Sequence, residues 1–94
     1  MTSVDVEIRN PSGLHARPAA TFVKAAAGFR SKVRLQNVSS GRPEGDAKSL
    51  LAVLACGVQR GHTVRVTADG EDEAEAVESL RALIESGLGE AVEP

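Results

Sequence analysis

The sequence predicts an α+β fold in which helices cover one face of a single antiparallel sheet. Two patterns alternate along the 94 residues. In some stretches apolar and polar residues take turns, as in half-buried strands, and in others apolar residues recur with the period of an amphipathic helix. Their order is strand, helix, strand, strand, helix, strand, helix. Because every segment has one apolar side, a sheet with its helices on one face buries all of those sides together.

The first strand and the first helix are separated by a short loop. Apolar residues occupy every second position of 4–8, and the run Asn-Pro-Ser-Gly at 10–13 then interrupts the pattern. A helix is predicted over 16–27, with Gly28 as its C-terminal stop. A second strand is predicted over 32–36. The residues that this helix and this strand are expected to bury are Ala19, Phe22, Val23, Ala26, Val33 and Leu35.

The middle of the chain is less regular. Residues 37–46 are rich in Ser, Gly and Pro, and they suit either a short irregular third strand or an extended loop. A short helix is predicted from Leu50 to Leu54, with Ser49 as its N-cap and an end near Gly57. The next strand is predicted over 62–68, where Val64, Val66 and Ala68 alternate with polar residues.

The last helix has the clearest pattern. Acidic residues crowd 71–75, where they interact favourably with the positive end of the helix dipole, so we interpret them as helix-start electrostatics and not as a metal site. Gly87 closes the helix, and residues from Leu88 onward are expected to form a loose tail. The predicted domain therefore spans 1–88, followed by a tail over 89–94. The predicted buried stripe of the helix is Ala76, Val77, Leu80, Leu83 and Ile84.

The composition excludes several classes of protein. With 41% hydrophobic residues the chain suits one small globular domain, and its net charge of -2 gives no general attraction to nucleic acid or to a membrane surface. Cys56 is the only cysteine, which rules out an internal disulfide and a cysteine-rich zinc site and suggests a small core residue. His62 is interpreted as structural or exposed. No segment resembles a signal peptide or a membrane span, so a cytoplasmic protein is expected.

Residues 13–18 (Gly-Leu-His-Ala-Arg-Pro) place His15 where the first helix begins. A helix start offers unpaired backbone N–H groups, here those of Ala16 and Arg17, and the positive end of the dipole, which together suit a phosphate. Neutral imidazole has a free ring nitrogen for nucleophilic attack, and Arg17 can add a charge-assisted hydrogen bond. Pro18 is tolerated in the first turn. The spacing equally allows a structural interpretation, in which His15 caps the helix and Arg17 is solvated. Metal binding is not expected, because no further ligand lies at helical spacing from His15.

These residues resemble the active-site signature of the HPr family, the histidine-containing phosphocarriers of the phosphoenolpyruvate-dependent sugar phosphotransferase system. Gly-Leu-His-Ala-Arg-Pro-Ala-Ala at 13–20 carries the resemblance, which extends from about Val4 to Leu88. Three further blocks match in the same order: Phe22-Val23-Lys24, Lys48-Ser49-Leu50 and Gly70-Glu71-Asp72-Glu73. Several ordered blocks are much more specific than the histidine motif alone.

The resemblance implies an open-faced β-sandwich, with a four-stranded antiparallel sheet under three helices in the order βαββαβα. It implies that His15 accepts a phosphoryl group on Nδ1 from phospho-enzyme I and passes it to IIA domains of sugar permeases. Arg17 matches the arginine beside the phosphohistidine, and Ser12, Ala16 and Pro18 are the expected phosphate-supporting residues. Such a protein is a monomeric carrier that uses no cofactor, and its partners supply most of the catalysis.

Two further features follow from the resemblance. Ser49 matches the serine that an HPr kinase/phosphorylase modifies in some bacteria, a role compatible with an N-cap worth about 1 kcal/mol. Four apolar residues in a two-turn helix exceed what one face can bury, and the resemblance implies that one or two of them, Leu50 and Leu51 first, stay exposed at the centre of a docking surface with a basic rim. Lys24 and Lys48 are expected to form this rim, and a solvated surface role remains the alternative for each of them. The expected docking residues are Ala20, Lys24, Lys48, Leu50 and Leu51.

The family leaves the downstream branch open. HPr-like domains also occur in nitrogen-related phosphotransferase branches and in multidomain donors to dihydroxyacetone kinase, and His15 is common to all of them. The alternative function is a regulatory or binding module that acts through the 50–54 surface without turnover. The pair of His15 and Arg17 favours the carrier, because a module that only binds needs no nucleophile there.

Overall fold

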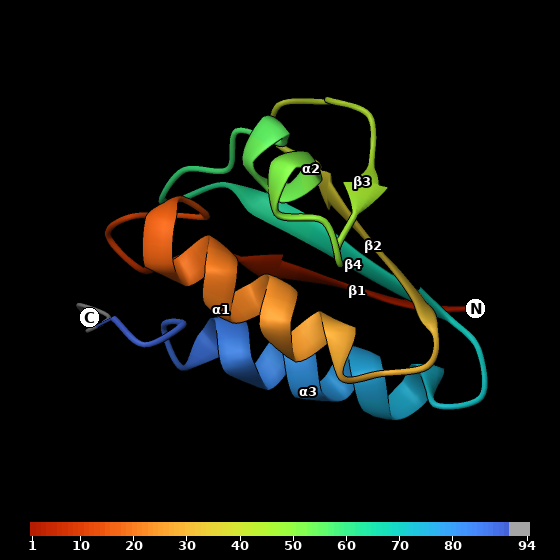
Figure 1. The fold of residues 1–94 in the computed structure, drawn as a ribbon. Helices are drawn as coiled ribbons and strands as arrows, with labels where there is room; N and C mark the ends of the chain where they lie inside the picture. Colours follow the sequence, from red (N-terminus) through yellow and green to blue (C-terminus); the bar gives the residue numbers. More distant parts are fainter. Residues whose placement is uncertain (91–94) are drawn as a thin grey trace.

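Within residues 1–90, which are the residues that the computed structural model describes, the elements follow the predicted order βαββαβα (Figure 1). The sheet has the strand order β1-β4-β2-β3, and every neighbouring pair is antiparallel. Both long helices lie side by side over one face of the sheet (Figure 1). The predicted open-faced sandwich is confirmed. The elements are β1 (Thr2–Glu7), α1 (Ala16–Ala27), β2 (Lys32–Asn37), β3 (Gly45–Asp46), α2 (Leu50–Ala55), β4 (Thr63–Asp69) and α3 (Glu73–Glu85).

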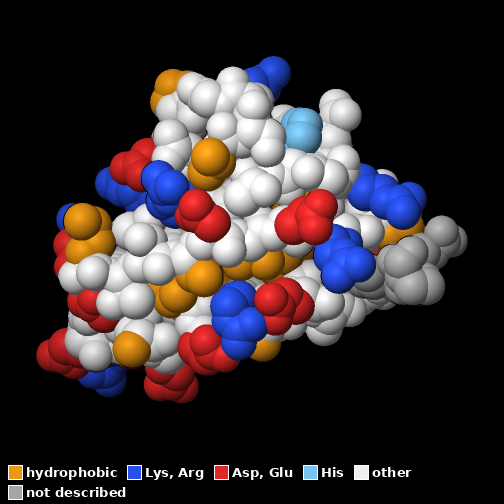
Figure 2. All heavy atoms as spheres, turned by 180° about the vertical axis from the view of Figure 1, so that it is seen from behind, with side chains coloured by type: hydrophobic (Ala, Val, Ile, Leu, Met, Phe, Trp, Pro, Cys, Tyr) orange, Lys and Arg blue, Asp and Glu red, His pale blue; other side chains and the backbone are white. Residues whose placement is uncertain are grey.

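The two faces of the sheet differ as the alternating sequence requires. Val66 of β4 lies opposite Val4 of β1 on one side and Leu35 of β2 on the other, so apolar side chains share the face under the helices. The opposite face carries charged side chains of both signs over the strands (Figure 2), including an ion pair of 2.8 Å between Arg65 Nε and Asp5 Oδ1. One face is therefore dry and the other is solvated.

The core is built from aliphatic residues around one phenylalanine. Phe22 of α1 is fully buried, as are Leu80 of α3 and Leu35 of β2. Val23 and Leu83 are only half-buried at its edge. Cys56 is buried, as predicted, and burial raises the pKa of its thiol.

The helix ends agree with the sequence except in detail. Helix α1 spans the predicted residues, although Gly28 ends it with a right-handed φ of -74° and therefore needs no glycine-specific conformation. Ser49 is the N-cap of α2, since its Oγ accepts a hydrogen bond of 3.2 Å from Ala52 N.

The acidic start of α3 serves a second purpose that the sequence did not indicate. Asp72 makes no side-chain cap for its own helix. Its carboxylate instead accepts hydrogen bonds from Arg30 N (2.8 Å), Ser31 N (2.9 Å) and the Ser31 hydroxyl, and these bonds lower its pKa to about 2. Asp72 thus joins α3 to the start of β2. Across residues 1–90 no three His, Cys, Asp or Glu side chains gather as metal ligands.

The irregular segment 37–46 contains both of the structures that its composition allowed. Asn37 ends β2, residues 38–41 form turns, 42–44 have no regular structure, and Gly45–Asp46 pairs with β2 opposite Leu35 and Arg34. A Cβ at Gly45 would lie 3.2 Å from Ala52 O, so the strand packs closely on α2.

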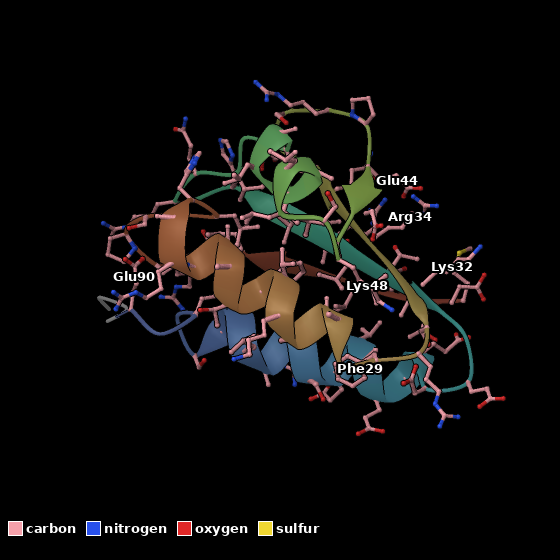
Figure 3. All side chains as sticks on the ribbon, viewed as in Figure 1. Phe29, Lys32, Arg34, Glu44, Lys48 and Glu90 are labelled. Atoms are coloured by element: carbon pink, nitrogen blue, oxygen red, sulfur yellow. The ribbon has the colours of Figure 1, made fainter. Side chains whose placement is uncertain are left out.

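The predicted loose tail from Leu88 is wrong for the residues that the structure describes. The chain turns back at Gly87 and Leu88, which have φ values of 96° and 54°, and Leu88 is fully buried. Glu90 then lies at the end of the molecule where α1 begins (Figure 3). Its carboxylate accepts hydrogen bonds from Asn10 Nδ2 (3.0 Å), Ser12 N (3.0 Å) and Ser12 Oγ (2.7 Å). The rest of the expected tail, 91–94, lies outside the described residues. No helix within 1–90 is long and apolar enough to cross a membrane.

Candidate functional site

His15 lies at the N-terminus of α1, and its side chain is exposed. It occupies the N-cap position with extended backbone angles (φ -126°, ψ 159°), yet its ring makes no capping hydrogen bond. His15 is thus the N-cap residue, as the structural interpretation expected, but its side chain does not cap the helix. An exposed imidazole that does no capping is suited to a reaction with a second molecule.

The loop before His15 is held on two sides. Leu14 is buried and donates its N–H to Val58 O (3.0 Å), while Asn10 Nδ2 donates to Gly13 O (2.9 Å). Gly13 has a left-handed φ of 60°, and a Cβ there would lie 2.5 Å from Val58 O and 2.8 Å from Gln59 Cα. Only glycine fits this contact.

The entry to α1 combines unpaired donors with backbone strain. Ala16, directly after His15, has a φ of 49° in the left-handed region, which is costly for a residue with a Cβ. The N–H groups of Ala16 and Arg17 belong to the first turn and have no helical acceptor. Pro18 is buried and has no N–H, so this expected phosphate-supporting residue shapes the turn and cannot donate to an anion. The helix start therefore offers two backbone donors beside His15.

The two polar side chains expected near His15 differ in availability. Arg17 is exposed and forms no salt bridge or side-chain hydrogen bond within the described part of the chain. Ser12, in contrast, donates both its N–H and its hydroxyl to Glu90. Hydrogen bonds from Asn10 and Ser12 lower the pKa of Glu90, which shows that they favour its charged form. Ser12 could donate to a phosphate only if its hydrogen bonds to the Glu90 carboxylate were broken first.

A hollow of about 350 Å³ lies beside His15. One side is lined by Pro11, Ser12 and His15, and the other by Gln59 and Arg60. Sequence reasoning missed the last two residues. The flanking glycines predict a turn near 57–61, but no local pattern places that turn against the loop before α1.

His62 is structural, as expected, and the structure explains how. Its Nδ1 accepts hydrogen bonds from Gln59 N (3.1 Å) and from Asn37 Nδ2 (3.0 Å). Two donors on Nδ1 assign the ring proton to Nε2. Neutral His62 thereby holds the turn that carries Arg60.

The predicted apolar docking centre is exposed. Leu50 is 43% exposed and Leu51 is 81% exposed, whereas Leu54 packs against the core. Helices α1 and α2 contact each other, and Ala20 and Lys24 of α1 are also exposed. Whether this surface binds a partner stays a prediction.

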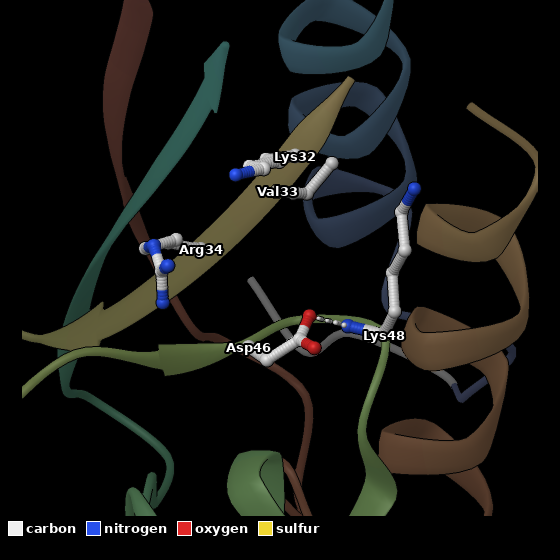
Figure 4. A pocket seen from close by; sticks show the side chains of 5 residues that line it. All are labelled: Lys32, Val33, Arg34, Asp46 and Lys48. Carbon is white, nitrogen blue, oxygen red and sulfur yellow. Dashed lines mark hydrogen bonds between the residues drawn. The ribbon is translucent and has the colours of Figure 1, made fainter. Parts of the chain in front are cut away.

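Lys48, the other lysine expected at the rim of the docking surface, is less exposed than Lys24. Lys48 is half-buried, and its Nζ donates to Phe29 O (2.7 Å) beyond the end of α1. It borders a hollow of about 210 Å³ with Lys32, Arg34 and Asp46, but its side chain runs away from Arg34 (Figure 4). Lys48 therefore braces the end of α1, and of the two lysines only Lys24 is exposed.

The comparisons with known proteins identify a family for this chain. Residues 2–86 match the sequence family described as "PTS HPr component phosphorylation site". The Phosphocarrier protein HPr of Haemophilus influenzae is 48% identical over 84 residues, which cover 89% of this chain and 95% of that protein. The Multiphosphoryl transfer protein of the same organism is 47% identical over 85 residues. The match covers 90% of this chain but only 17% of that longer relative.

Solved structures give the same relationship. HPr-C-His from Thermoanaerobacter tengcongensis superposes with a TM-score of 0.91 and 41% identity, covering 98% of this chain and all of that one. The Bacillus subtilis catabolite repression protein Crh, described as a swapped dimer, has a TM-score of 0.70 and 40% identity, covering 93% of this chain and 97% of that one. A second structure from Thermoanaerobacter tengcongensis is also described as a dimer, so the expected monomer stays a prediction here.

An open-faced sandwich with an exposed histidine at the start of its first helix is the arrangement expected of a small phosphocarrier protein. The extent of the match decides the family. This chain belongs to the HPr family, the phosphocarriers of the phosphotransferase system.

Proposed function

We propose that this protein accepts a phosphoryl group from phospho-enzyme I on His15 and passes it to IIA domains of sugar permeases. The observation that carries the proposal is the exposure of His15 at the N-terminus of α1, where its ring makes no capping bond. Family membership supports the relay, since the matched region is described by its phosphorylation site. The protein is then a carrier and not an enzyme, because its phosphorylated form is the product of one partner and the substrate of the next, and those partners supply most of the catalysis.

The chemistry requires a lone pair on Nδ1 of His15. That lone pair attacks the phosphorus, the bond from phosphorus to the donor atom breaks, and the bonding electron pair stays on the donor. In the onward step the acceptor attacks the phosphorus and the Nδ1–P bond breaks, so its electron pair returns to the ring. The negative phosphoryl group is stabilised by the N–H groups of Ala16 and Arg17, the positive end of α1 and the Arg17 guanidinium.

The same proposal assigns the partner surface. The exposed side chains of Leu50 and Leu51 form the apolar centre, with Ala20 and Lys24 on the neighbouring helix. A cation at the edge of such a surface speeds the encounter with an acidic partner. The relay uses no cofactor and operates in the cytoplasm, where phosphoenolpyruvate is available.

Phosphorylation in vitro tests the relay. The protein is incubated with phosphoenolpyruvate and enzyme I, and intact-mass measurement should show a gain of one phosphate that is labile in acid and stable in base. The His15→Ala variant should show no gain, although it keeps His62, the only other histidine. Label that persists in His15→Ala would contradict the assignment.

A second candidate function is regulation by docking without phosphoryl turnover. The 81% exposure of Leu51 favours it, because an apolar side chain that open is suited to a partner. Failure of the wild-type protein to label, under conditions in which a known HPr labels, would favour this candidate over the relay.

Ser49 is proposed as a regulatory phosphorylation site of an HPr kinase. Its position next to Leu50 supports the idea, because a phosphate would add about two negative charges at the edge of the docking surface. The Ser49→Asp variant should accept phosphate from enzyme I more slowly than wild type, with Ser49→Ala as the uncharged control. Equal rates for Ser49→Asp and Ser49→Ala would argue against this role.

A further inference from the structure

The hollow beside His15 has a second wall that the relay proposal does not use. Gln59 and Arg60 line it from the turn before β4, opposite the loop that carries Ser12 and His15. Arg17, the arginine of the histidine motif, is not among the lining residues. A phosphoryl group on His15 would therefore border two different arginines.

Arg60 sits on a turn whose position is set by the backbone. Leu14 N donates to Val58 O (3.0 Å), and Gly61 N donates to Ile8 O (2.7 Å). These bonds attach both ends of the turn to the segment leading to α1. Because Gly13 has no side chain, its backbone packs directly against that of Val58 and Gln59, and the two loops lie in close contact. The distance between His15 and the turn is consequently a property of the fold.

The charges in the hollow single out Arg60. Among its lining residues Arg60 is the only one that is always cationic. Its side chain is exposed, and in the described chain it has neither a salt bridge nor a hydrogen bond. Ser12 already gives both of its donors to Glu90. Arg60 is thus the cationic group with donors to spare for an anion in this hollow.

We propose that Arg60 is a second phosphoryl-binding residue of the His15 site, which contacts the phosphoryl oxygens from the turn before β4. The proposal rests on the relay through His15. A guanidinium presents paired N–H donors to a phosphoryl group and stays charged throughout the cycle. Arg60 therefore stabilises the phosphorylated form in addition to the contribution of Arg17 and the helix start.

The test compares Arg60→Gln with Arg60→Lys and with Lys32→Gln. Lys32→Gln removes the same charge from an exposed position at the opposite end of the molecule from Glu90 (Figure 3). Initial rates of phosphorylation by enzyme I are measured, with kcat and KM separated, at low and at high salt. The isolated phosphorylated proteins are then followed for hydrolysis without any partner. Thermal unfolding checks that the exposed substitutions leave the fold intact.

We expect Arg60→Gln to lower kcat for phosphoryl acceptance by about tenfold, the worth of one charge-assisted hydrogen bond, at both salt concentrations. We also expect the phosphohistidine of Arg60→Gln to hydrolyse faster than that of wild type, because Arg60 stabilises the phosphorylated form. Arg60→Lys should show partial rescue, and Lys32→Gln should behave as wild type. A loss confined to KM that disappears at high salt would make Arg60 a steering charge for the partner and overturn the proposal. Wild-type kinetics and hydrolysis in Arg60→Gln would overturn it as well, while leaving the relay intact. The absence of label in wild type would instead refute the relay itself.

Discussion

The contact between Gly13 and the turn before β4 makes a quantitative prediction. Replacing Gly13 by alanine puts a Cβ on a residue with φ 60° and within 2.5 Å of Val58 O and 2.8 Å of Gln59 Cα. The left-handed conformation alone costs about 1–2 kcal/mol, and pressing a methyl group against backbone that cannot rotate away adds about 1–3 kcal/mol. We expect Gly13→Ala to lose about 2–5 kcal/mol of unfolding free energy, which lowers Tm by at least about 8 °C in a domain of this size.

Gly41→Ala is the matched control for this change. Gly41 has a similar left-handed φ of 69°, but no atom lies within 4 Å of a Cβ built there. Its substitution should therefore cost only the conformational part, about 1–2 kcal/mol. Denaturant unfolding of both variants measures the difference, and an unchanged m-value shows that the comparison is valid.

The same substitution should impair His15, because the loop and the turn must separate to admit the methyl group. Phosphoryl acceptance should fall in Gly13→Ala and stay at the wild-type rate in Gly41→Ala. If Gly13→Ala proves no more destabilising than Gly41→Ala, to within about 0.5 kcal/mol, close packing does not hold the two walls of the hollow together and the reasoning is refuted.

Three further predictions concern other parts of the molecule. Ser49→Ala removes the hydrogen bond to Ala52 N and should cost about 1 kcal/mol in denaturant unfolding, and a loss no larger than that of an exposed serine in mid-helix would show that the cap contributes nothing. Leu51→Ala should leave stability within about 0.5 kcal/mol because the side chain is 81% exposed, yet it should weaken binding to enzyme I in calorimetry; unchanged affinity would remove Leu51 from the docking surface. The pKa of Asp72 falls from 3.8 to about 2 on folding, so its contribution is complete above about pH 4 and is lost as pH drops through 2. Asp72→Asn should therefore flatten the stability profile in that range, and a profile parallel to wild type would contradict the contacts with Arg30 and Ser31.

Much of the fold could be predicted from the sequence, because its determinants are local. The bounds of α1, the inward positions of β2 and the Ser49 cap all follow from residue spacing within one or two turns. That some apolar residues of α2 stay exposed was predictable for a related reason, since a short helix has only one side to bury, but the choice of Leu50 and Leu51 came from the family resemblance. The spacing around His15 indicated free donors at a helix start but allowed a structural role equally well, and the resemblance to a known family favoured the phosphocarrier.

Contacts between polar groups far apart in the chain were not predictable. The carboxylate of Glu90 binds Ser12 across 78 positions, and that of Asp72 binds Arg30 across 42. A single hydrogen bond or charge leaves no periodic trace in the sequence, whereas apolar burial repeats with the period of its element. The prediction of a loose tail was wrong for the same reason: Leu88 is a single apolar residue outside any repeat, so its burial also leaves no periodic pattern in the sequence.

The sequence by itself thus determined the elements, their apolar sides and the position of His15 at the start of a helix. Tertiary structure decided the environment of that histidine. The sheet brings Arg60 to the hollow beside His15, and the chain reversal after α3 brings the Glu90 carboxylate to the donors of Ser12. The physical reason is that secondary structure depends on neighbours in the chain, while the field around a reacting group depends on neighbours in space.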